Sequence, residues 1–370
     1  LANEETHSLL RSIFYIRYLL FSLLICYLYN FYPKFKKIFF RIMTLNLMFI
    51  SIHAYLIHFL NFDLLSFNFD SISFKQNYSV LFSKEGLPES SNLTGFQTDY
   101  RISGIFYDES ILGSYLQKIL PIYLGMIFLL KKPKKYLIFF LFLFFLLPIS
   151  GERSAFVLAS FFIFLFVLTY QSSFKKKFYI GIIFLIGLSL IIGTNPNVKE
   201  RIIGNTLKIL TEKSSDQPDK KFNVNLFSRG HQGHFTSAYQ IFKDNPFFGV
   251  GIKNFRYECK KDKYAGMYSC TTHPHNTYLQ LLSETGIIGF LFVFIFFIYL
   301  LIKIIKIIFL NFRNKTFSSN QYKCFLIAVF INLWPLIPTG SFFNNWICIS
   351  YFLSLGFLLS ETYKINNIFK

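Results

Sequence analysis

Acidic side chains are scarce in this sequence of 370 residues, which has 19 Asp and Glu against 38 Lys and Arg and a formal net charge of +19. The few charges within its apolar runs lie near the ends of those runs. A proton- or sodium-coupled carrier needs carboxylates within the membrane, and many transporters are built from internal repeats. Neither feature is evident in the sequence, which argues against a transporter.

Motifs of several enzyme classes are also missing. The sequence has no phosphate-binding glycine loop, no Rossmann fingerprint and no Ser-His-Asp array, and no cofactor is predicted. His231 and His234 have no ligand pattern with cysteines or carboxylates, and acidic partners are scarce near His273 and His275. No metal site is therefore predicted.

Cysteines are few, five in all, and do not make a disulfide framework. Cys26, Cys324 and Cys348 lie in apolar runs and are expected to be inert packing residues. Cys259 and Cys270 both fall in a long polar segment, where they can pair if that segment faces an oxidising compartment. The sequence leaves this pairing open.

Apolar and aromatic residues are abundant: 53% of the chain is hydrophobic, 21% is aromatic, and 51 residues are Phe. Several runs reach the roughly 20 apolar residues that a membrane span requires. The basic residues cluster in short loops between these runs, as the positive-inside rule predicts, so the net charge does not indicate nucleic-acid binding. The sequence predicts an all-α, polytopic transmembrane helix bundle in a lipid bilayer.

Nine apolar runs and their basic loops define the predicted topology. The runs cover residues 10–31, 42–62, 111–130, 136–149, 155–170, 178–193, 286–310, 324–337 and 346–360. Placing the lysine-rich loops inside puts both long polar segments, 63–110 and 194–285, outside. The predicted division is a bundle of six helices at 1–193 with an external loop at 63–110, a large, mostly helical external loop at 194–285, and three helices at 286–370.

The end of the long polar loop holds the densest group of reactive side chains, in the segment 272–280. Thr272 suits a helix cap and Pro274 a first helical turn, so a short helix is expected to start here, with free N–H groups that favour phosphate. His275 fits a general base, and Asn276 can orient it by a hydrogen bond. Considered alone, a surface histidine is more often without such a role.

Two arginines are candidate anion ligands. Arg153 lies in a polar turn between two apolar runs, where it can either pair with Glu152 or hold a phosphate group bidentately. Arg229 begins a predicted amphipathic helix that ends near Asp244. Its apolar stripe is expected at Phe235, Ala238, Tyr239 and Phe242.

Four segments resemble signatures of the O-antigen ligase/O-antigen polymerase superfamily and follow that family's order. His275-Asn276, nine residues and then GIIG at 286–289 resemble its H-N-x9-G-x-x-G signature. The other three are DNPFFGVG at 244–251, similar to "NPxxGxG", SGERSA at 150–155, similar to "SGxRxA", and RISGIF at 101–106, similar to "RxxGxF". Members usually have about twelve spans, so this chain, which starts at Leu1, is expected to lack about three at its start.

The resemblance implies a metal-independent, inverting glycosyltransferase of the bacterial inner membrane with its active site on the periplasmic side. It would transfer an O-antigen-type glycan from undecaprenyl pyrophosphate to an acceptor sugar hydroxyl on lipid A-core. By matching positions, His275 would be the base, and Arg153 and Arg229 would hold the pyrophosphate. Arg101, His273 and Asn276 are further candidates for substrate contact.

Other functions stay open at this point. Within the family, the protein would instead be a polymerase that joins lipid-linked repeats, or a protein O-oligosaccharyltransferase. Outside it, a transporter or channel and a non-catalytic membrane scaffold are the alternatives.

Overall fold

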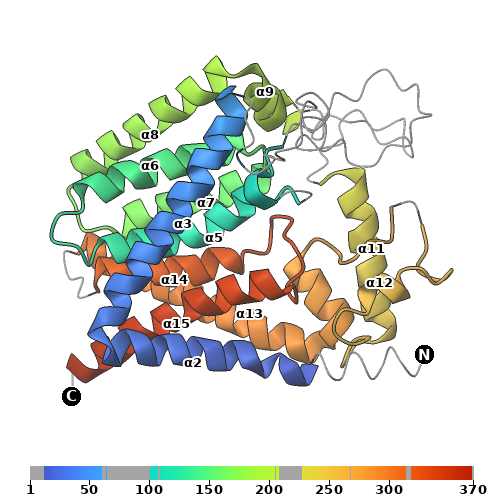
Figure 1. Cartoon of the computed structure of the whole chain (residues 1–370). Helices are drawn as coiled ribbons and strands as arrows, with labels where there is room; N and C mark the ends of the chain where they lie inside the picture. The colour runs from blue at the N-terminus through green and yellow to red at the C-terminus, as the bar shows by residue number, and fades with distance from the viewer. Residues whose placement is uncertain are drawn as a thin grey trace. The chain divides into compact units, whose positions relative to one another are not determined.

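The structure is a computed structural model that describes residues 12–60, 64, 101–106, 109–204, 206–207, 227–266, 268–313 and 318–368. Every regular element within these residues is helical, so the predicted all-α fold is confirmed (Figure 1). Most of the external loop expected at 63–110 lies outside the described residues, as does the stretch 208–226 of the second loop.

Within the described residues, five helices are long and apolar enough to cross a membrane. They are α2 (Ile16–Phe31), α3 (Pro33–Leu60), α8 (Phe174–Thr194), α13 (Thr277–Phe312) and α15 (Asn345–Ile368). The other predicted runs form shorter helices, α5 (Leu112–Ile127), α6 (Lys134–Ile149), α7 (Arg153–Thr169) and α14 (Asn320–Asn332). The chain is a multi-pass membrane protein, and the count of nine spans stays a prediction.

The described residues pack as two compact units, each with its own internal contacts. Unit 1 contains residues 1–33, 168–171 and 209–370, and unit 2 contains residues 34–167 and 172–208. His275 and Arg229 belong to unit 1, whereas Arg101 and Arg153 belong to unit 2. The two groups of predicted site residues are therefore described separately.

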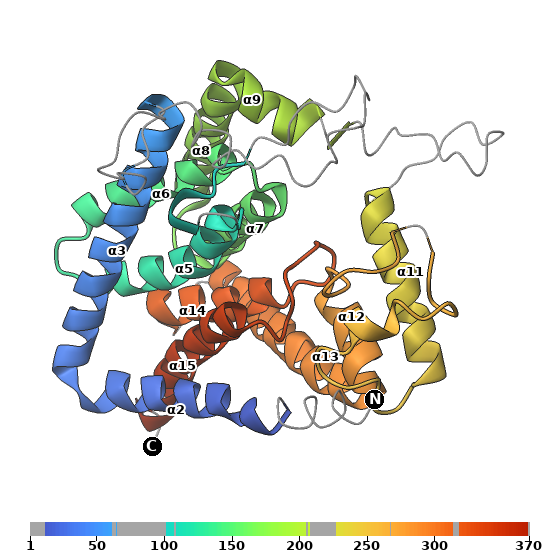
Figure 2. The same cartoon turned by 45° about the vertical axis from the view of Figure 1, so that its right-hand side comes forward.

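In unit 1, α2 packs along α15 through a close approach of the two backbones (Figure 2). A Cβ atom at Gly356 would lie 2.8 Å from the carbonyl oxygen of Ser22, and Ser22 Oγ donates to the carbonyl of Phe352 at 2.6 Å. Small residues allow such approaches between membrane helices, where van der Waals packing and hydrogen bonds replace the hydrophobic effect. On the other side of α15, Phe325 of α14 stacks on Phe357.

In unit 2, α3, α5 and α6 meet through aromatic side chains. Phe40 of α3 stacks on Tyr123 of α5 with ring centroids 5.4 Å apart, and its edge contacts Tyr136 of α6 at 5.0 Å. Tyr55 donates a hydrogen bond to the carbonyl of Phe142 at 2.9 Å. These contacts explain part of the unusual aromatic content, since large rings fill the space between helices.

The long helix α13 is broken at Gly286, whose φ of 65° and ψ of −167° are accessible almost only to glycine. The first half, residues 277–285, directly follows the segment 270–276, which we call the histidine loop. The second half carries the exposed apolar residues Phe292 and Ile295. An exposed face of this kind suits lipid rather than water.

The backbone groups freed by this break bond to the turn at 244–251. Ile287 N donates to Pro246 O at 2.8 Å, and the carbonyls of Ser283 and Glu284 accept from Val250 N at 3.0 Å and Gly251 N at 2.9 Å. The two segments approach so closely that a Cβ at Gly286 would lie 2.2 Å from the carbonyl oxygen of Phe247, and one at Gly249 would lie 2.5 Å from the carbonyl carbon of Glu284. The turn at 244–251 and residues 283–287 therefore pack directly against each other, and we call this contact the joint.

Candidate active site

The histidine loop leads directly into α13, whose first residue is Thr277. Asn276 caps this helix, because its Oδ1 accepts hydrogen bonds from Tyr278 N at 3.0 Å and Leu279 N at 3.1 Å. Its Nδ2 donates to Pro335 O at 2.8 Å. The expected cap at Thr272 is thus wrong, and the helix starts after His275 rather than before it.

The cap also changes two expectations about chemistry. No side-chain hydrogen bond is formed between the two described residues Asn276 and His275, because the Asn276 amide is occupied at both ends. The same amide satisfies two of the helix's free N–H groups, which are then not directed at a phosphate. Asn276 instead fixes where the chain turns into α13.

His275 itself is held in a left-handed backbone conformation, with φ of 54°. Its carbonyl accepts a hydrogen bond from Thr339 N at 2.9 Å, and Thr277 Oγ1 lies 3.1 Å from Thr339 Oγ1. Non-glycine residues adopt this conformation rarely, and such strain is concentrated at functional sites. The 335–344 segment therefore holds His275 in a defined position.

Helix α11 (Arg229–Asp244) supplies two more imidazoles. Ser228 caps it and places its Oγ 2.7 Å from Nδ1 of His231. The helix ends at Asp244 as predicted, but the predicted apolar stripe is partly wrong, because Tyr239 is 48% exposed. The buried residues of α11 are Ser237, Ala238 and Ile241, so the face that meets the core is shifted around the helix from the predicted stripe.

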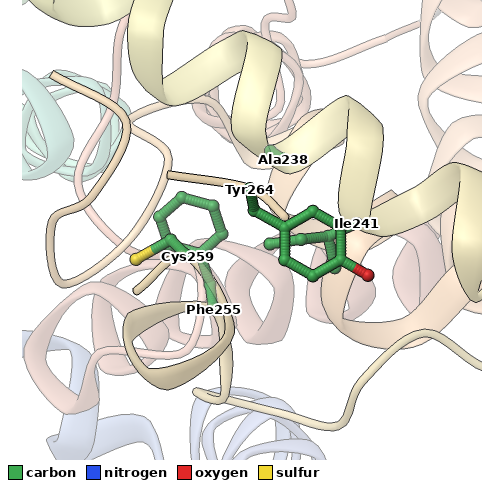
Figure 3. Packing of buried hydrophobic residues seen from close by; sticks show 5 residues of the cluster. All are labelled: Ala238, Ile241, Phe255, Cys259 and Tyr264. Carbon is green, nitrogen blue, oxygen red and sulfur yellow. The ribbon is translucent and has the colours of Figure 1, made fainter. Parts of the chain in front are cut away.

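The small core beneath α11 consists of Ala238, Ile241, Phe255, Cys259 and Tyr264 (Figure 3). It joins α11 to the short helix α12 (Phe255–Glu258), while Leu279 of α13 packs against its margin. Tyr264 also donates to Asp244 Oδ2 at 2.6 Å. This core fixes the histidines of α11 relative to the histidine loop.

Four histidines converge as a result. The ring centroid of His275 lies 4.2 Å from that of His273, 5.4 Å from that of His234 and 5.5 Å from that of His231. We call these four residues the histidine cluster. Arg229 begins the same helix two positions before His231.

Burial in the cluster favours the neutral form of His275 and His273. Burial, followed by the neighbouring His273, His231 and His234, lowers the pKa of His275 to about 3. Burial likewise lowers the pKa of His273 to about 4, with smaller effects from Arg256 and the other imidazoles. A neutral imidazole has a free lone pair, so His275 can accept a proton at pH 7.

No group of three or more His, Cys, Asp or Glu within the described part of the chain has an arrangement that would hold a metal ion. The four imidazoles are included in this statement.

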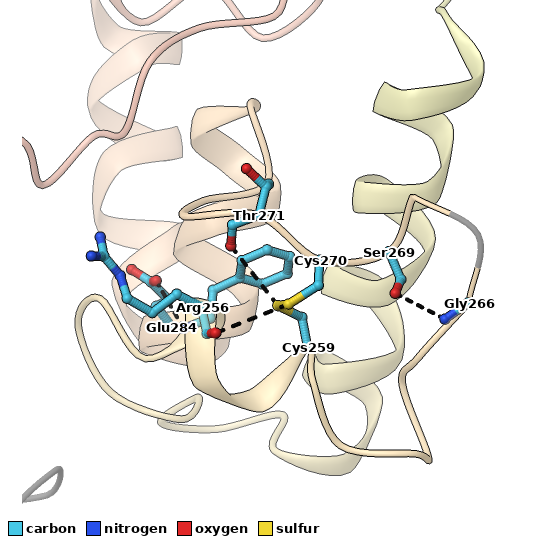
Figure 4. Close-up of a disulfide and its surroundings, with 8 residues drawn as sticks. Arg256, Cys259, Gly266, Ser269, Cys270, Thr271 and Glu284 are labelled. Carbon is cyan, nitrogen blue, oxygen red and sulfur yellow. Dashed lines mark hydrogen bonds between the residues drawn. A yellow bond between two sulfur atoms is a disulfide. The ribbon is translucent and has the colours of Figure 1, made fainter. Parts of the chain in front are cut away.

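A disulfide between Cys259 and Cys270 anchors the histidine loop to α12 (Figure 4). The pairing that the sequence left open is therefore formed. It fixes Cys270 three residues before His273, while Cys259 is fully buried in the core beneath α11. The remaining cysteines Cys26, Cys324 and Cys348 are free, as expected.

Loss of this disulfide is expected to lower the free energy of unfolding of the loop region by about 3 kcal/mol, from the closure entropy of a loop of this length. The double variant Cys259→Ser/Cys270→Ser, and wild type treated with reductant, should show a lower thermal midpoint and slower turnover. Cys26→Ser serves as the control because Cys26 is not bridged. An unchanged midpoint after complete reduction would contradict the anchoring role.

Glu284 of α13 is a buried carboxylate. It accepts hydrogen bonds from Lys253 N at 3.0 Å, Phe255 N at 3.2 Å and Gln280 Nε2 at 3.0 Å. The first two contacts hold the start of α12, so Glu284 connects that helix to α13. Arg256 of α12 is drawn beside Glu284 in Figure 4.

Unit 2 holds the second group of predicted residues, around the turn 150–153. Glu152 does not pair with Arg153. It caps α5, accepting from Gly113 N at 2.6 Å and from Ser114 Oγ at 2.5 Å. Arg153 instead donates to Thr206 Oγ1 at 3.2 Å.

Two more arginines surround this turn. The buried Arg201, in the short π-helix η2 (Glu200–Gly204), donates from Nε to Gly151 O at 3.0 Å. Arg101 precedes the 3-10 turn η1 (Gly104–Phe106), and its neighbour Ile102 donates from N to Ser150 O at 3.2 Å. The "RxxGxF" and "SGxRxA" segments are therefore adjacent, and the turn concentrates positive charge.

The structure brings His273, His275, His231 and His234 together in unit 1, and Arg101 and Arg153 together in unit 2. Sequence reasoning set aside His231 and His234 as weak metal ligands and did not consider Arg201 or Arg256. The i, i+3 spacing of the two α11 histidines placed them on one helix face and was the available signal.

Residues 138–294 match the family model described as O-Antigen ligase. The match includes Arg153, Arg229, His275 and the turn at 244–251. No match was found among curated proteins or among solved structures.

Proposed function

Because residues 138–294 place this chain in the O-antigen ligase superfamily, as its sequence motifs predicted, we propose a specific reaction for this membrane glycosyltransferase. The reaction transfers an O-antigen-type glycan from undecaprenyl pyrophosphate to a sugar hydroxyl of lipid A-core. It takes place at the periplasmic face of the inner membrane. The observation that carries the proposal is a neutral, strained His275 among three further imidazoles.

In the proposed mechanism, His275 accepts the proton of the acceptor hydroxyl as that oxygen bonds to the anomeric carbon of the donor. The bond from the anomeric carbon to the diphosphate oxygen breaks, and its electron pair leaves with the diphosphate. A single in-line displacement inverts the anomeric configuration. Diphosphate is a good leaving group, so positioning and electrostatic stabilisation suffice.

The arginines have a matching proposed role. Arg229 stabilises the negative charge that develops on the leaving diphosphate, for which the guanidinium group is suited. Arg153, which belongs to unit 2, is proposed as an anion ligand from its matching position in the family motif. Arg101 and His273 are proposed substrate contacts, whereas Asn276 is assigned a structural role because its amide is occupied by the helix cap and by Pro335 O. His231 and His234 are added here, as residues that position His275 and keep it neutral.

The testing experiment uses purified protein in nanodiscs, undecaprenyl-pyrophosphate-linked glycan and lipid A-core, with EDTA present. We expect glycan attached to lipid A-core, with inverted anomeric configuration. Product that forms only when a divalent metal is restored would overturn the metal-independent mechanism, and no product with any acceptor would overturn the proposed activity.

The choice of acceptor distinguishes the proposed ligase from a polymerase of the same family. Its motif set is shared, so a second lipid-linked glycan and an acceptor protein are offered in parallel reactions. Elongated lipid-linked glycan without any lipid A-core product would identify a polymerase. Product on protein alone would identify an O-oligosaccharyltransferase.

The expected pH dependence of glycan transfer follows from the lowered pKa values of His275, about 3, and His273, about 4. Since kcat/KM reports the free enzyme, it should show no acid limb near 6.5, the ordinary pKa of histidine. Bound diphosphate is anionic and raises the pKa of His275, so the acid limb of kcat should lie at higher pH than that of kcat/KM. Acid limbs of both parameters at 6.5 would contradict this arrangement.

The free energy of unfolding changes over the same pH range and must be measured alongside the transfer rate. The unfolded chain has ordinary histidine pKa values and binds more protons than the folded chain below about pH 6.5. The histidine contribution to stability is therefore complete above that pH and is lost as the pH falls toward the lowered values near 4. Thermal midpoints at each pH separate this loss from a loss of catalysis.

A further inference from the structure

Three buried side-chain nitrogens of unit 1 have no hydrogen-bond partner among the described residues. They are His234 Nδ1, His273 Nε2 and Arg256 Nε. They come from three segments: α11, the histidine loop and α12. Buried polar atoms are nearly always paired, so three in one region require an explanation.

Two of these atoms belong to the histidine cluster, and the third belongs to a side chain close to it. His234 and His273 both flank His275, with ring centroids 5.4 Å and 4.2 Å from it. Arg256 is close enough for its positive charge to act on His273. The disulfide holds α12 and the histidine loop together, and Cys270 Sγ lies 4.0 Å from Arg256 O. The mechanism described above assigns no role to Arg256.

The nearby carboxylate does not account for Arg256. Both oxygens of Glu284 already accept hydrogen bonds, from Lys253 N and Gln280 Nε2 on one oxygen and from Phe255 N on the other. The charge of Arg256 acts on Glu284 as it does on His273, but no ion pair within 4 Å joins these two described side chains. A half-buried arginine beside neutral imidazoles favours an anion as its ligand, since a guanidinium binds phosphate or carboxylate through two parallel hydrogen bonds.

We propose that Arg256 is a substrate-binding residue that holds an oxyanion of the glycan substrates beside His275, with His234 and His273 as hydrogen-bonding neighbours. The proposal rests on the proposed function and adds a ligand contact to that site. The oxyanion belongs either to the donor diphosphate or to an acidic substituent on the acceptor glycan. In both cases it brings negative charge to His275 and raises the basicity of that imidazole.

The first experiment needs no turnover and no variant. Wild-type protein in nanodiscs is treated with an arginine-selective dicarbonyl reagent, with and without inorganic pyrophosphate, and the modification of Arg256 is followed by mass spectrometry. Pyrophosphate is expected to protect Arg256 and to leave the modification of Arg313 unchanged. Equal modification of Arg256 with and without pyrophosphate would overturn the proposal, even if the transferase activity is present.

The second experiment separates the two sources of the anion. R256Q and R256K are compared with Lys260→Gln, which removes one exposed positive charge from the residues following α12. R256Q is expected to raise KM about tenfold to hundredfold for the substrate that carries the anion, and R256K to restore part of it. A rise for the donor identifies the diphosphate, and a rise only for an acceptor with phosphate groups, absent after phosphatase treatment, identifies the acceptor.

Two results would overturn a binding role for Arg256. One is unchanged KM values for both substrates. The other is a lower kcat alone, together with a lower thermal midpoint that R256K restores, which would make Arg256 a structural residue. Loss of the proposed function is recognised separately, because wild type would then give no product while the protection by pyrophosphate is still measurable.

Discussion

Replacing His275 by Asn is expected to reduce kcat of glycan transfer by about 100-fold to 10,000-fold, the usual contribution of a general base. Asn tolerates the left-handed backbone conformation that His275 adopts, with φ of 54°. The amide lacks a lone pair able to accept a proton near neutral pH, so only the chemistry is removed. The measurement is initial-rate transfer to lipid A-core by the variant in nanodiscs.

Comparison with His275→Ala and His275→Gly separates the backbone from the base. Ala in a left-handed conformation costs about 1–2 kcal/mol, whereas Gly has no such cost. If the imidazole is the base, all three variants lose transfer to a similar degree, although Gly alone is relieved of the left-handed strain that the native histidine and Ala both have. His58→Asn is the matched control, because His58 lies on α3 of unit 2. Normal turnover by His275→Asn would exclude His275 as the base.

The second large effect is expected at the joint between α13 and the turn at 244–251. Gly286→Ala forces a side chain into a φ of 65° and places a Cβ 2.2 Å from the carbonyl oxygen of Phe247. The backbone strain costs about 1–2 kcal/mol, and the overlap adds about 1–3 kcal/mol. We expect lower expression, a lower thermal midpoint and loss of transfer, although no proposed substrate contact is changed.

Gly249→Ala should have a similar effect, because its Cβ would meet the backbone at 284–286 from the opposite side of the joint. Gly181→Ala is the control, since Gly181 is within α8 and a Cβ there meets nothing within 4 Å. Combining Gly286→Ala with Gly249→Ala tests whether the two positions are energetically coupled. If both damage one joint, the double variant should be little worse than either single variant, whereas additive losses would indicate two independent sites.

The joint gives a physical reason for the spacing of the family motifs. The nine residues between Asn276 and Gly286 form the first half of α13, which runs from the cap to the kink. Inserting or deleting a residue there would rotate the histidine loop by about 100° around the helix axis relative to the lipid-facing half, given 3.6 residues per turn. His275 is thereby kept at a defined height above the apolar part of α13.

The sequence by itself determined the membrane class, the helical fold and the position of the long helices. These properties follow from local physics, because a segment of about 20 apolar residues in lipid must satisfy its backbone within its own helix. The end of α11 and the family were also readable, since Asp244 with the following turn and the glycine-containing motifs are contiguous in the chain. Free Cys26, Cys324 and Cys348 followed from their apolar surroundings in the same way.

Only the tertiary structure decided which polar groups meet. His231 and His234 are about 40 residues from His275 in the sequence, and the core around Phe255 is what places each of their rings within 5.5 Å of the His275 ring. The partners of Glu152 were likewise decided by packing. Its carboxylate accepts hydrogen bonds from Gly113 N and Ser114 N at the start of α5, which are about 40 residues earlier in the sequence. Hydrogen-bond partners, the Cys259–Cys270 pairing and the neutrality of His275 depend on long-range contacts, and no pattern within a single segment contains them.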